Sequence, residues 1–251
     1  MSTNEPLNRY RIVVAYDGTC YAGWQVQPNG VTIQEKLEEA LLRLTGERPK
    51  VHGSGRTDQG VHARHQVAHF DLHKRFPPRS LPRAMNSFLP PDIRVLRAAK
   101  TAPGFDARRQ AAGKEYRYFI WNAEIMPPFL RNYKAHVRNP LNVAAMQEAA
   151  ALLEGRHDFA AFSANPNREI ETTVREVFAL KVARRGREVV ILARGSGFLY
   201  KMVRSLAGFL IRVGEGAVSP KEARSILLSR TRTARVPTAP PHGLFLWHVS
   251  Y

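Results

Sequence analysis

Apolar residues near the start of the chain follow a strand pattern and then a helix pattern. The run 11–16 (RIVVAY) predicts a buried strand that ends at the turn Asp17-Gly18. Thr32 is followed three residues later by Glu35, which is the spacing of a capping box at the start of a helix. Beyond it, apolar residues recur at helical spacing until Gly46, at Ile33, Leu37, Ala40, Leu41 and Leu44. The pattern predicts a strand, a polar and aromatic loop, and an amphipathic helix.

The rest of the first half adds three predicted strands and a short helix. The strands are expected at 49–52, 65–72 and 93–98, and the helix at 80–88. A glycine-rich loop separates the first two of these strands. The resulting order, strand-helix-strand-strand-helix-strand, is that of the split β-α-β unit.

The second half is predicted to repeat this order. Strands are expected at 114–121, 174–183, 188–194 and 244–249, and helices at 143–153, at 199–213 and from Pro220 onward. Ser219 and Glu222 form a second capping box, with Pro220 at the first helical position. The repeat rests on element order alone. Because the two halves join within 101–113, we expect two α/β domains at 1–103 and 104–251.

Composition and charge indicate which class of protein this is and which kind of molecule it binds. A chain of 251 residues, 44% apolar and 24% charged, can bury a sizeable core without disulfides or metal. The net charge is 38 − 21 = +17, which favours a polyanionic partner and nucleic acid first. A single cysteine, Cys20, excludes an internal disulfide. The polar start at 1–9 and the lack of long apolar runs predict a cytoplasmic protein without a membrane segment.

The glycine-rich loop at 53–63 (GSGRTDQGVHA) carries the densest chemical signal. Its three glycines free the backbone for turns and close approach, and the loop presents Arg56 and Asp58 two residues apart. The ordinary alternative for such a loop is a plain connection with an Asx-turn at Asp58. Neither phosphate-loop pattern is present, and an anionic side chain where phosphate would bind argues against nucleotide cradling.

This loop resembles the signature of the tRNA pseudouridine synthases of the A type, Gly-Arg-Thr-Asp-x-Gly-Val-His-Ala. The resemblance continues along nearly the whole chain, in 16–18 (YDG), 23–25 (GWQ), 105–108 (FDAR), 114–118 (KEYRY), 197–204 (GFLYKMVR), 239–240 (AP) and 243–244 (GL). It implies an α+β fold of two pseudo-repeated ferredoxin-like halves, with a mixed or antiparallel sheet and a central RNA-binding cleft. It also implies a homodimer and no cofactor.

By the same resemblance, Asp58 is the catalytic residue. Isomerising uridine requires that the C1′–N1 bond break, that the uracil rotate and that C5 join C1′. A carboxylate can attack covalently, or act as a base at the 2′ carbon so that a glycal forms, and the sequence leaves both routes open. Either role requires an ionised carboxylate, which a nearby cation favours. Arg204 matches the family position that pairs with this aspartate, and it follows apolar residues on a predicted helix.

Two further residues match substrate-binding positions of the family. Tyr116 matches the active-site tyrosine, whose ring would stack on the target base and whose hydroxyl would help remove the proton from C5. Tyr118 shares its strand face and is expected to be packing. Arg56 would fill the space of the flipped nucleotide or hold its phosphate, because a stacked base cannot rotate inside a helix. An RNA contact without a flipping role is the alternative for Arg56.

Two further patterns concern metal binding by histidines and phosphate contact by basic clusters. His62, His65, His69 and His73 have spacings that occur in metal sites, but only alternate residues of a strand share a face, so we expect no metal. Three basic clusters are expected to contact phosphate: Lys74, Arg75, Arg79 and Arg83; Arg108 and Arg109; and Arg184, Arg185 and Arg187.

Taken with the resemblance, these observations predict a tRNA-specific isomerase that forms pseudouridine at positions 38, 39 and 40 of the anticodon stem-loop. An enzyme that acts at several neighbouring positions is expected to recognise RNA shape more than sequence. The alternative classes are a non-catalytic RNA-binding protein and a metal-dependent nuclease. A protein that only binds RNA has no need of a carboxylate that faces the RNA, which argues against the first alternative. A metal-dependent nuclease needs paired carboxylates, whereas residues 53–66 contain only Asp58, which argues against the second.

Overall fold

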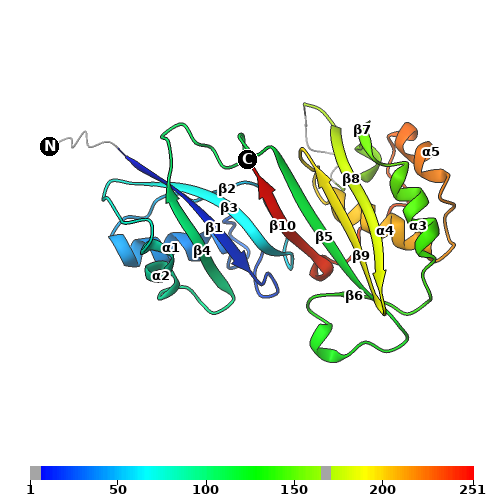
Figure 1. The fold of residues 1–251 in the computed structure, drawn as a ribbon, viewed down its shortest axis with the longest axis horizontal. Coiled ribbons are helices and arrows are strands. Elements are labelled where there is room, and N and C mark those ends of the chain that lie inside the picture. The colour runs from blue at the N-terminus through cyan, green and yellow to red at the C-terminus, as the bar shows by residue number, and fades with distance from the viewer. Residues whose placement is uncertain (1–6, 165–170) are drawn as a thin grey trace. The chain divides into compact units, whose positions relative to one another are not determined.

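The chain folds into two compact units, each with mixed α and β structure. The structure, a computed structural model, describes residues 7–164 and 171–251 (Figure 1). The first unit comprises the chain up to Ala112 together with Leu246–Tyr251, and the second comprises Gly113–Phe245. These units differ from the predicted domains 1–103 and 104–251 in two places, because residues 104–112 and the end of the last strand belong to the first unit.

The first unit has the predicted order of strands and helices. Its elements are β1 (Asn8–Tyr16), α1 (Ile33–Thr45), β2 (His52–Gly53), β3 (His62–Leu72), α2 (Leu81–Asn86) and β4 (Ile93–Lys100). Strand β1 lies between β4 and β3 and is antiparallel to both, and the short β2 pairs antiparallel with β3. This arrangement is that of a split β-α-β unit.

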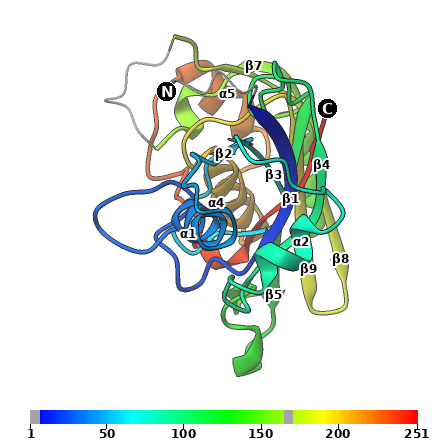
Figure 2. The same ribbon diagram turned by 90° about the vertical axis from the view of Figure 1, so that its left-hand side faces the viewer.

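The core of the first unit forms where one face of β1 and β3 meets α1. Alternate residues of β1 are buried on this face: Tyr10, Ile12, Val14 and Tyr16. The register places Tyr10 opposite Phe70 of β3, and the two rings stack with centroids 5.8 Å apart. Helix α1 buries Ile33, Leu37, Ala40 and Leu41, which confirms the predicted spacing. Figure 2 shows α1 beside this face of the strands.

Both ends of α1 are fixed by the residues that the sequence pattern identified. The Thr32 hydroxyl accepts the N–H of Glu35 at 3.3 Å, and the Glu35 carboxylate accepts the N–H of Thr32 at 3.4 Å. This confirms the capping box, which stabilises a helix by about 1 kcal/mol. Gly46 ends the helix in the left-handed conformation, with φ +79°, and its N–H donates to the Leu42 carbonyl.

The second unit contains a mixed sheet with helices on one side (Figure 1). Its elements are β5 (Gly113–Asn122), β6 (Ala135–Val137), α3 (Val143–Ala151), β7 (Gly155–Asp158), β8 (Val174–Arg185), β9 (Glu188–Gly195), α4 (Met202–Gly214), α5 (Glu222–Ser229) and the start of β10 (Leu244–Ser250). Short 3₁₀ turns are η1 (Pro128–Leu130), η2 (Ala160–Phe162) and η3 (Pro241–Gly243). The strand order is β5-β9-β8-β7 with antiparallel neighbours, and β6 pairs in parallel with β5.

Two helices of the second unit begin later than predicted. Helix α4 begins at Met202 because Lys201 adopts the left-handed conformation, with φ +55°. Helix α5 begins at Glu222 with Lys221 as its N-cap, so the predicted start with Ser219 as N-cap and Pro220 at the first helical position is wrong, although the Glu222 carboxylate accepts the N–H of Ser219 at 3.0 Å. The strands β6 and β7 have only 3 and 4 residues, too few for an alternating pattern to reveal them.

The second unit repeats only part of the first unit's arrangement. The pairings β5-β9 and β9-β8 are antiparallel, like β1-β3 and β3-β2. The elements β6, β7 and α5 have no counterparts among the described elements of the first unit. The α+β class is confirmed, and the pseudo-repeat stays a prediction.

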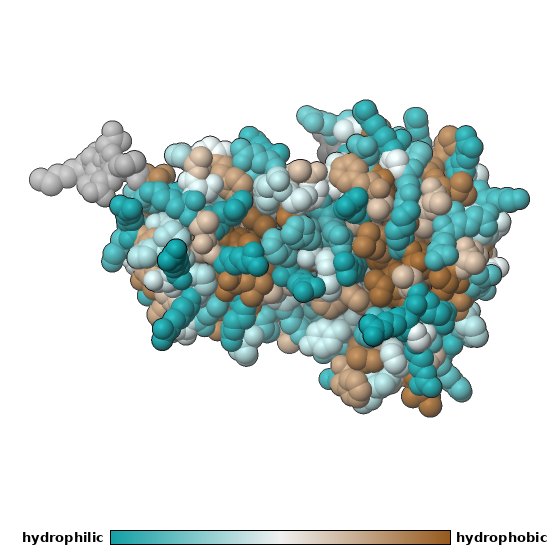
Figure 3. All heavy atoms as spheres, viewed as in Figure 1, coloured by the Kyte–Doolittle hydropathy of each residue, from teal (hydrophilic) through white to brown (hydrophobic). Residues whose placement is uncertain are grey.

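Hydrophilic side chains cover much of the surface, with hydrophobic side chains gathered over the second unit's sheet (Figure 3). The register of β8, β9 and β5 aligns Ala183, Val190 and Phe119 across this side of the sheet. Phe245 meets Phe119 edge-on, with centroids 5.3 Å apart. Within the described parts of the chain, no helix has both the length and the apolar character needed to span a membrane.

Candidate active site

Asp58 lies in the loop between β2 and β3, and buried polar side chains hold the start of this loop. The N–H of Ser54 donates to the Val67 carbonyl at 2.7 Å, and the Ser54 hydroxyl donates to Gln66 Oε1 at 2.7 Å. The Gln66 amide nitrogen in turn donates to the Gly55 carbonyl at 2.8 Å. Because Ser54 and Gln66 are fully buried, breaking these bonds would leave polar groups unpaired in the core.

Two segments from the start of the chain pack against the middle of this loop. The hydroxyls of Tyr16 and Thr57 lie 2.8 Å apart, and the N–H of Trp24 donates to the Thr57 carbonyl at 3.1 Å. Burial raises the pKa of the Tyr16 phenol, so this hydroxyl stays neutral and keeps its hydrogen bond. A Cβ on Gly23, where φ is +99°, would lie 2.6 Å from the Thr57 carbonyl oxygen. Only glycine fits between this segment and the loop.

A second close approach lies at the end of the loop. A Cβ on Gly18 would lie 2.0 Å from the Val61 carbonyl oxygen. The N–H of Gly18 donates to Nδ1 of the buried His62 at 3.0 Å, and Asp17 Oδ1 lies 3.1 Å from the same nitrogen. Nδ1 of His62 therefore lies between the backbone of Gly18 and the Asp17 carboxylate. The N–H of Val61 donates to the Asp58 carbonyl at 3.1 Å, which closes the turn after Asp58.

The loop buries one side chain and leaves its two neighbours accessible. Thr57 is buried, whereas Asp58 is half-buried and Arg56 is exposed. A carboxylate and a guanidinium therefore flank the buried threonine. Their position on a loop with a fixed backbone is typical of a site where chemistry needs defined geometry.

Tyr116 lies on β5 of the second unit, at the margin of the core. It is 8% exposed, and the Phe198 ring meets it edge-on with centroids 5.4 Å apart. Tyr118, two residues further along, is fully buried, and its hydroxyl donates to the Pro240 carbonyl at 3.0 Å. Burial raises the pKa of Tyr118, which keeps the phenol neutral. Tyr118 is therefore core packing, as predicted.

Arg204 lies in the first turn of α4 and is tied to the segment that precedes β10. Its Nε donates to the Ala239 carbonyl at 2.8 Å, and its own carbonyl accepts the N–H of Ala239 at 3.0 Å. A Cβ on Gly208, one turn further along, would lie 2.1 Å from the Pro237 carbonyl oxygen. The segment therefore lies close against the helix and orients the Arg204 guanidinium.

The predicted site residues are divided between the two units. Asp58 and Arg56 belong to the first unit, and Tyr116 and Arg204 belong to the second. The pairing of Arg204 with Asp58 and the central RNA-binding cleft stay predictions, because both would join the two units.

Two of the histidines considered for metal binding have other partners. His65 lies with its ring 4.5 Å from that of His248, and His69 Nδ1 accepts the N–H of Ala107 at 3.1 Å. Burial lowers the pKa of both His65 and His69, which favours their neutral forms. Over residues 7–164 and 171–251, no three His, Cys, Asp or Glu side chains form a group that could hold a metal ion.

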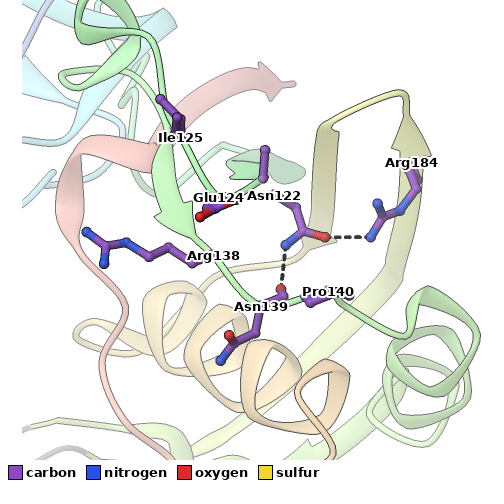
Figure 4. A pocket seen from close by; sticks show the side chains of 8 residues that line it. Asn122, Glu124, Ile125, Arg138, Asn139, Pro140 and Arg184 are labelled. Carbon is purple, nitrogen blue, oxygen red and sulfur yellow. Dashed lines mark hydrogen bonds between the residues drawn. The ribbon is translucent and has the colours of Figure 1, made fainter.

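The structure divides the third basic cluster. Arg184 Nη2 donates to Asn122 Oδ1 at 2.7 Å and to the Leu141 carbonyl at 3.0 Å, and Figure 4 shows its bond to Asn122. Arg184 therefore helps to hold the second unit together. All three arginines are exposed, but the Arg184 guanidinium is held by these two bonds, so the predicted phosphate contact of this cluster depends mainly on Arg185 and Arg187. The cavity beside Arg184, of about 880 Å³, is lined by none of the predicted site residues.

Comparisons with known proteins identify the family. A sequence profile described as tRNA pseudouridine synthase matches residues 12–108 and 149–251. The protein named tRNA pseudouridine synthase A from Pelobacter propionicus is 47% identical over 241 residues, 96% of this chain and 98% of that protein. Proteins of the same name from Geotalea uraniireducens and Brevibacillus brevis are 44% and 45% identical over 245 residues, 98% of this chain and 100% of each relative.

These matches define an RNA-modifying isomerase. The chain belongs to the tRNA pseudouridine synthase family, which confirms the resemblance seen in its motifs.

We expect Gly23→Ala to reduce both stability and isomerase activity. A left-handed alanine costs about 1–2 kcal/mol, and its Cβ would also displace the Thr57 carbonyl beside Asp58. Gly46→Ala is the matched control, because Gly46 has φ +79° and a Cβ added there would have nothing within 4 Å. Urea unfolding should show a larger loss of stability for Gly23→Ala than for Gly46→Ala, because only the first adds the contact with the Thr57 carbonyl, and product formation should be slower only for Gly23→Ala. Equal rates would contradict the role assigned to this contact.

Proposed function

We propose that this chain converts uridine to pseudouridine at positions 38, 39 and 40 in the anticodon stem-loop of tRNA, with Asp58 as the catalytic residue. The observation that carries the proposal is the Asp58 loop, whose backbone is fixed by buried hydrogen bonds while the Asp58 side chain stays half-buried. The names of the relatives support tRNA as the substrate. The positions within tRNA rest on the family resemblance.

Two roles in the isomerisation are open to Asp58. As a nucleophile, its carboxylate attacks C1′ while the C1′–N1 bond breaks, and C5 of the rotated uracil then displaces the carboxylate. As a base, it takes the proton from the 2′ carbon while uracil leaves, so that a glycal forms; C5 of the rotated uracil then joins C1′ as the Asp58 carboxyl returns the proton to C2′. In both routes C5 finally loses its proton. A fixed loop favours either route, because it holds the carboxylate at the reacting sugar.

Arg204, Tyr116 and Arg56 are proposed to complete the site. The Nε of Arg204 is bonded to Ala239, so a pairing with Asp58 would use the terminal guanidinium nitrogens. Such a pairing would favour the ionised carboxylate that both routes require. Tyr116 is proposed to stack on the base, and Arg56 to occupy the space of the flipped nucleotide or to bind its phosphate. No cofactor is proposed.

We also propose that the protein works as a cytoplasmic homodimer. The dimer rests on the family resemblance, and the row of Ala183, Val190 and Phe119 on the second unit's sheet offers an apolar surface for it. Light scattering at micromolar concentration should give twice the chain mass of 28.3 kDa. A single chain mass at that concentration would contradict the dimer.

The proposed activity is tested on a uridine-bearing tRNA transcript. After incubation, carbodiimide labelling and mass spectrometry of nuclease fragments locate pseudouridine, because the two isomers have equal mass before labelling. We expect label at positions 38, 39 and 40, wherever uridine stands there. Label confined to another arm of the tRNA would contradict the proposed positions, and no label at all would contradict the activity.

We expect Asp58→Asn to abolish turnover and to leave tRNA binding nearly unchanged. The substitution removes the carboxylate but keeps the size of the side chain, and it should lower the rate by more than about 10³-fold. Rate and Kd are measured on the same preparation. Turnover at an appreciable fraction of the wild-type rate would show that another residue carries the chemistry.

Substitutions of Tyr116 should separate the role of its ring from that of its hydroxyl. Tyr116→Phe keeps the stacking ring, whereas Tyr116→Leu removes both groups and should lose about 1–3 kcal/mol of base stacking. If the hydroxyl takes part in removing the C5 proton, Tyr116→Phe should slow the reaction after C5 has joined C1′. Rates near wild type for both variants would assign Tyr116 to core packing alone.

Binding of tRNA should weaken steeply as salt increases, because the net charge is +17. If about four to six phosphates are neutralised in looped RNA, log K should fall against log salt with a slope of about −3 to −4. The double variant Arg185→Glu with Arg187→Glu tests the other two arginines of the third cluster and leaves the hydrogen bonds of Arg184 intact. Fluorescence anisotropy across a salt series measures the slope. A flat response would contradict phosphate-driven binding, and an unchanged slope in the variant would place the contacts elsewhere.

A further inference from the structure

Arg232 lies in the irregular segment between α5 and β10, and it bridges a buried residue of α4 and a half-buried residue of its own segment. Its Nη1 donates to the Ser205 hydroxyl at 2.8 Å, and its Nη2 donates to the Thr238 hydroxyl at 2.8 Å. Ser205 is fully buried on α4, and Arg232 itself is half-buried. Partial burial disfavours the charged form of Arg232 and lowers its pKa. Among the described residues, its hydrogen-bond partners are these two hydroxyls rather than a carboxylate.

The two partners of Arg232 are the chain neighbours of a proposed active-site contact. Ser205 follows Arg204, and Thr238 precedes Ala239. Arg204 and Ala239 are themselves joined by two hydrogen bonds, from Arg204 Nε to the Ala239 carbonyl and from the Ala239 N–H to the Arg204 carbonyl. Arg232 therefore links both sides of the contact that orients the Arg204 side chain.

This bridge is needed because the segment has little regular structure of its own. It begins after α5, where Arg230 adopts the left-handed conformation with φ +52°, and it runs to η3 without a helix or strand. Pro237 approaches α4 so closely that only glycine fits at Gly208. A planar guanidinium can span two hydroxyls in a fixed fork geometry, which a lysine cannot do.

We propose that Arg232 is a positioning residue for the reaction, which sets the direction of the Arg204 guanidinium by clamping Thr238 and Ser205. This inference rests on the proposed role of Arg204. Loss of the clamp lets the Ala239 carbonyl move, and the Arg204 side chain moves with it. Displacement of a catalytic group by about 1 Å can lower a rate by about 10²-fold. RNA binding over the wider basic surface does not depend on this clamp.

The test compares Arg232→Gln with a matched control in the same segment. Arg235→Gln is the control, because Arg235 is exposed and its ion pair is with Glu222 on α5. We expect Arg232→Gln to lower the single-turnover rate by about 10- to 100-fold, with a less than threefold change in tRNA Kd. Arg235→Gln should keep the wild-type rate. A rate for Arg232→Gln equal to that of the control, or a weaker Kd at an unchanged rate, would overturn the proposal.

A double-mutant cycle separates positioning from a general structural role. In the background Arg204→Lys, the further change Arg232→Gln should cost little, because the guanidinium that it positions is already gone. The same fold-loss in both backgrounds would overturn the proposal. If Arg232→Gln does not fold, Thr238→Val and Thr238→Ser replace it in the test. The Thr238→Val variant should be slow, because it lacks the hydroxyl, and the Thr238→Ser variant should have nearly the wild-type rate. Equal rates for these two variants would contradict the clamp.

Failure of this inference can be told apart from failure of the proposed function. If the wild type forms no pseudouridine, the proposed function fails. If the wild type is active and Arg204→Lys is slow while Arg232→Gln is fast, only the role of Arg232 fails.

Discussion

The closeness of the Asp58 loop to two earlier turns is the constraint on which the rest of the first unit depends. At Gly18 and Gly23 the backbones approach so closely that a single added Cβ would lie 2.0 and 2.6 Å from a carbonyl oxygen of the loop. At these distances the loop cannot shift without moving the turns as well. Strand β1 and the capped start of α1 hold these turns, so the core of the unit sets the position of Asp58.

The second unit orients Arg204 by a similar principle. Backbone groups of Ala239 bond to Arg204 at its carbonyl and at its Nε, and Gly208 permits the close approach of the same segment. Asp58 and Arg204 therefore each depend on an irregular segment that is held by hydrogen bonds. Fixing such groups before the substrate binds reduces the ordering that the transition state must supply.

Much of the fold could be predicted from local patterns. The capping box at Thr32 and the alternation in β1 are local signals, and the structure confirms both. The late start of α4 could not be predicted, because lysine has no intrinsic preference for the left-handed conformation that Lys201 adopts, with φ +55°. The short β6 was missed because three residues carry no periodic signal.

For the site, the motifs identified Asp58, Tyr116 and Arg204 as candidates, but not the groups that hold them. Gln66 is one of several polar residues of its strand, and only the structure shows it bonding both Ser54 and Gly55. Arg232 carries no signal at all, since its partners are 27 and 6 residues away along the chain. Arg184 was grouped with its neighbours by charge, whereas its hydrogen bonds tie it to Asn122 and Leu141.

The central claim is that the Asp58 loop is held rigidly before RNA binds, and amide hydrogen exchange of the free protein tests it most directly. The N–H groups of Gly18, Trp24 and Ser54 donate to groups of this loop or of the strand behind it. We predict that these three amides exchange as slowly as those in the middle of β1, because they open only when the unit unfolds. Exchange as fast as that of an exposed linker residue such as Gly104 would contradict the account.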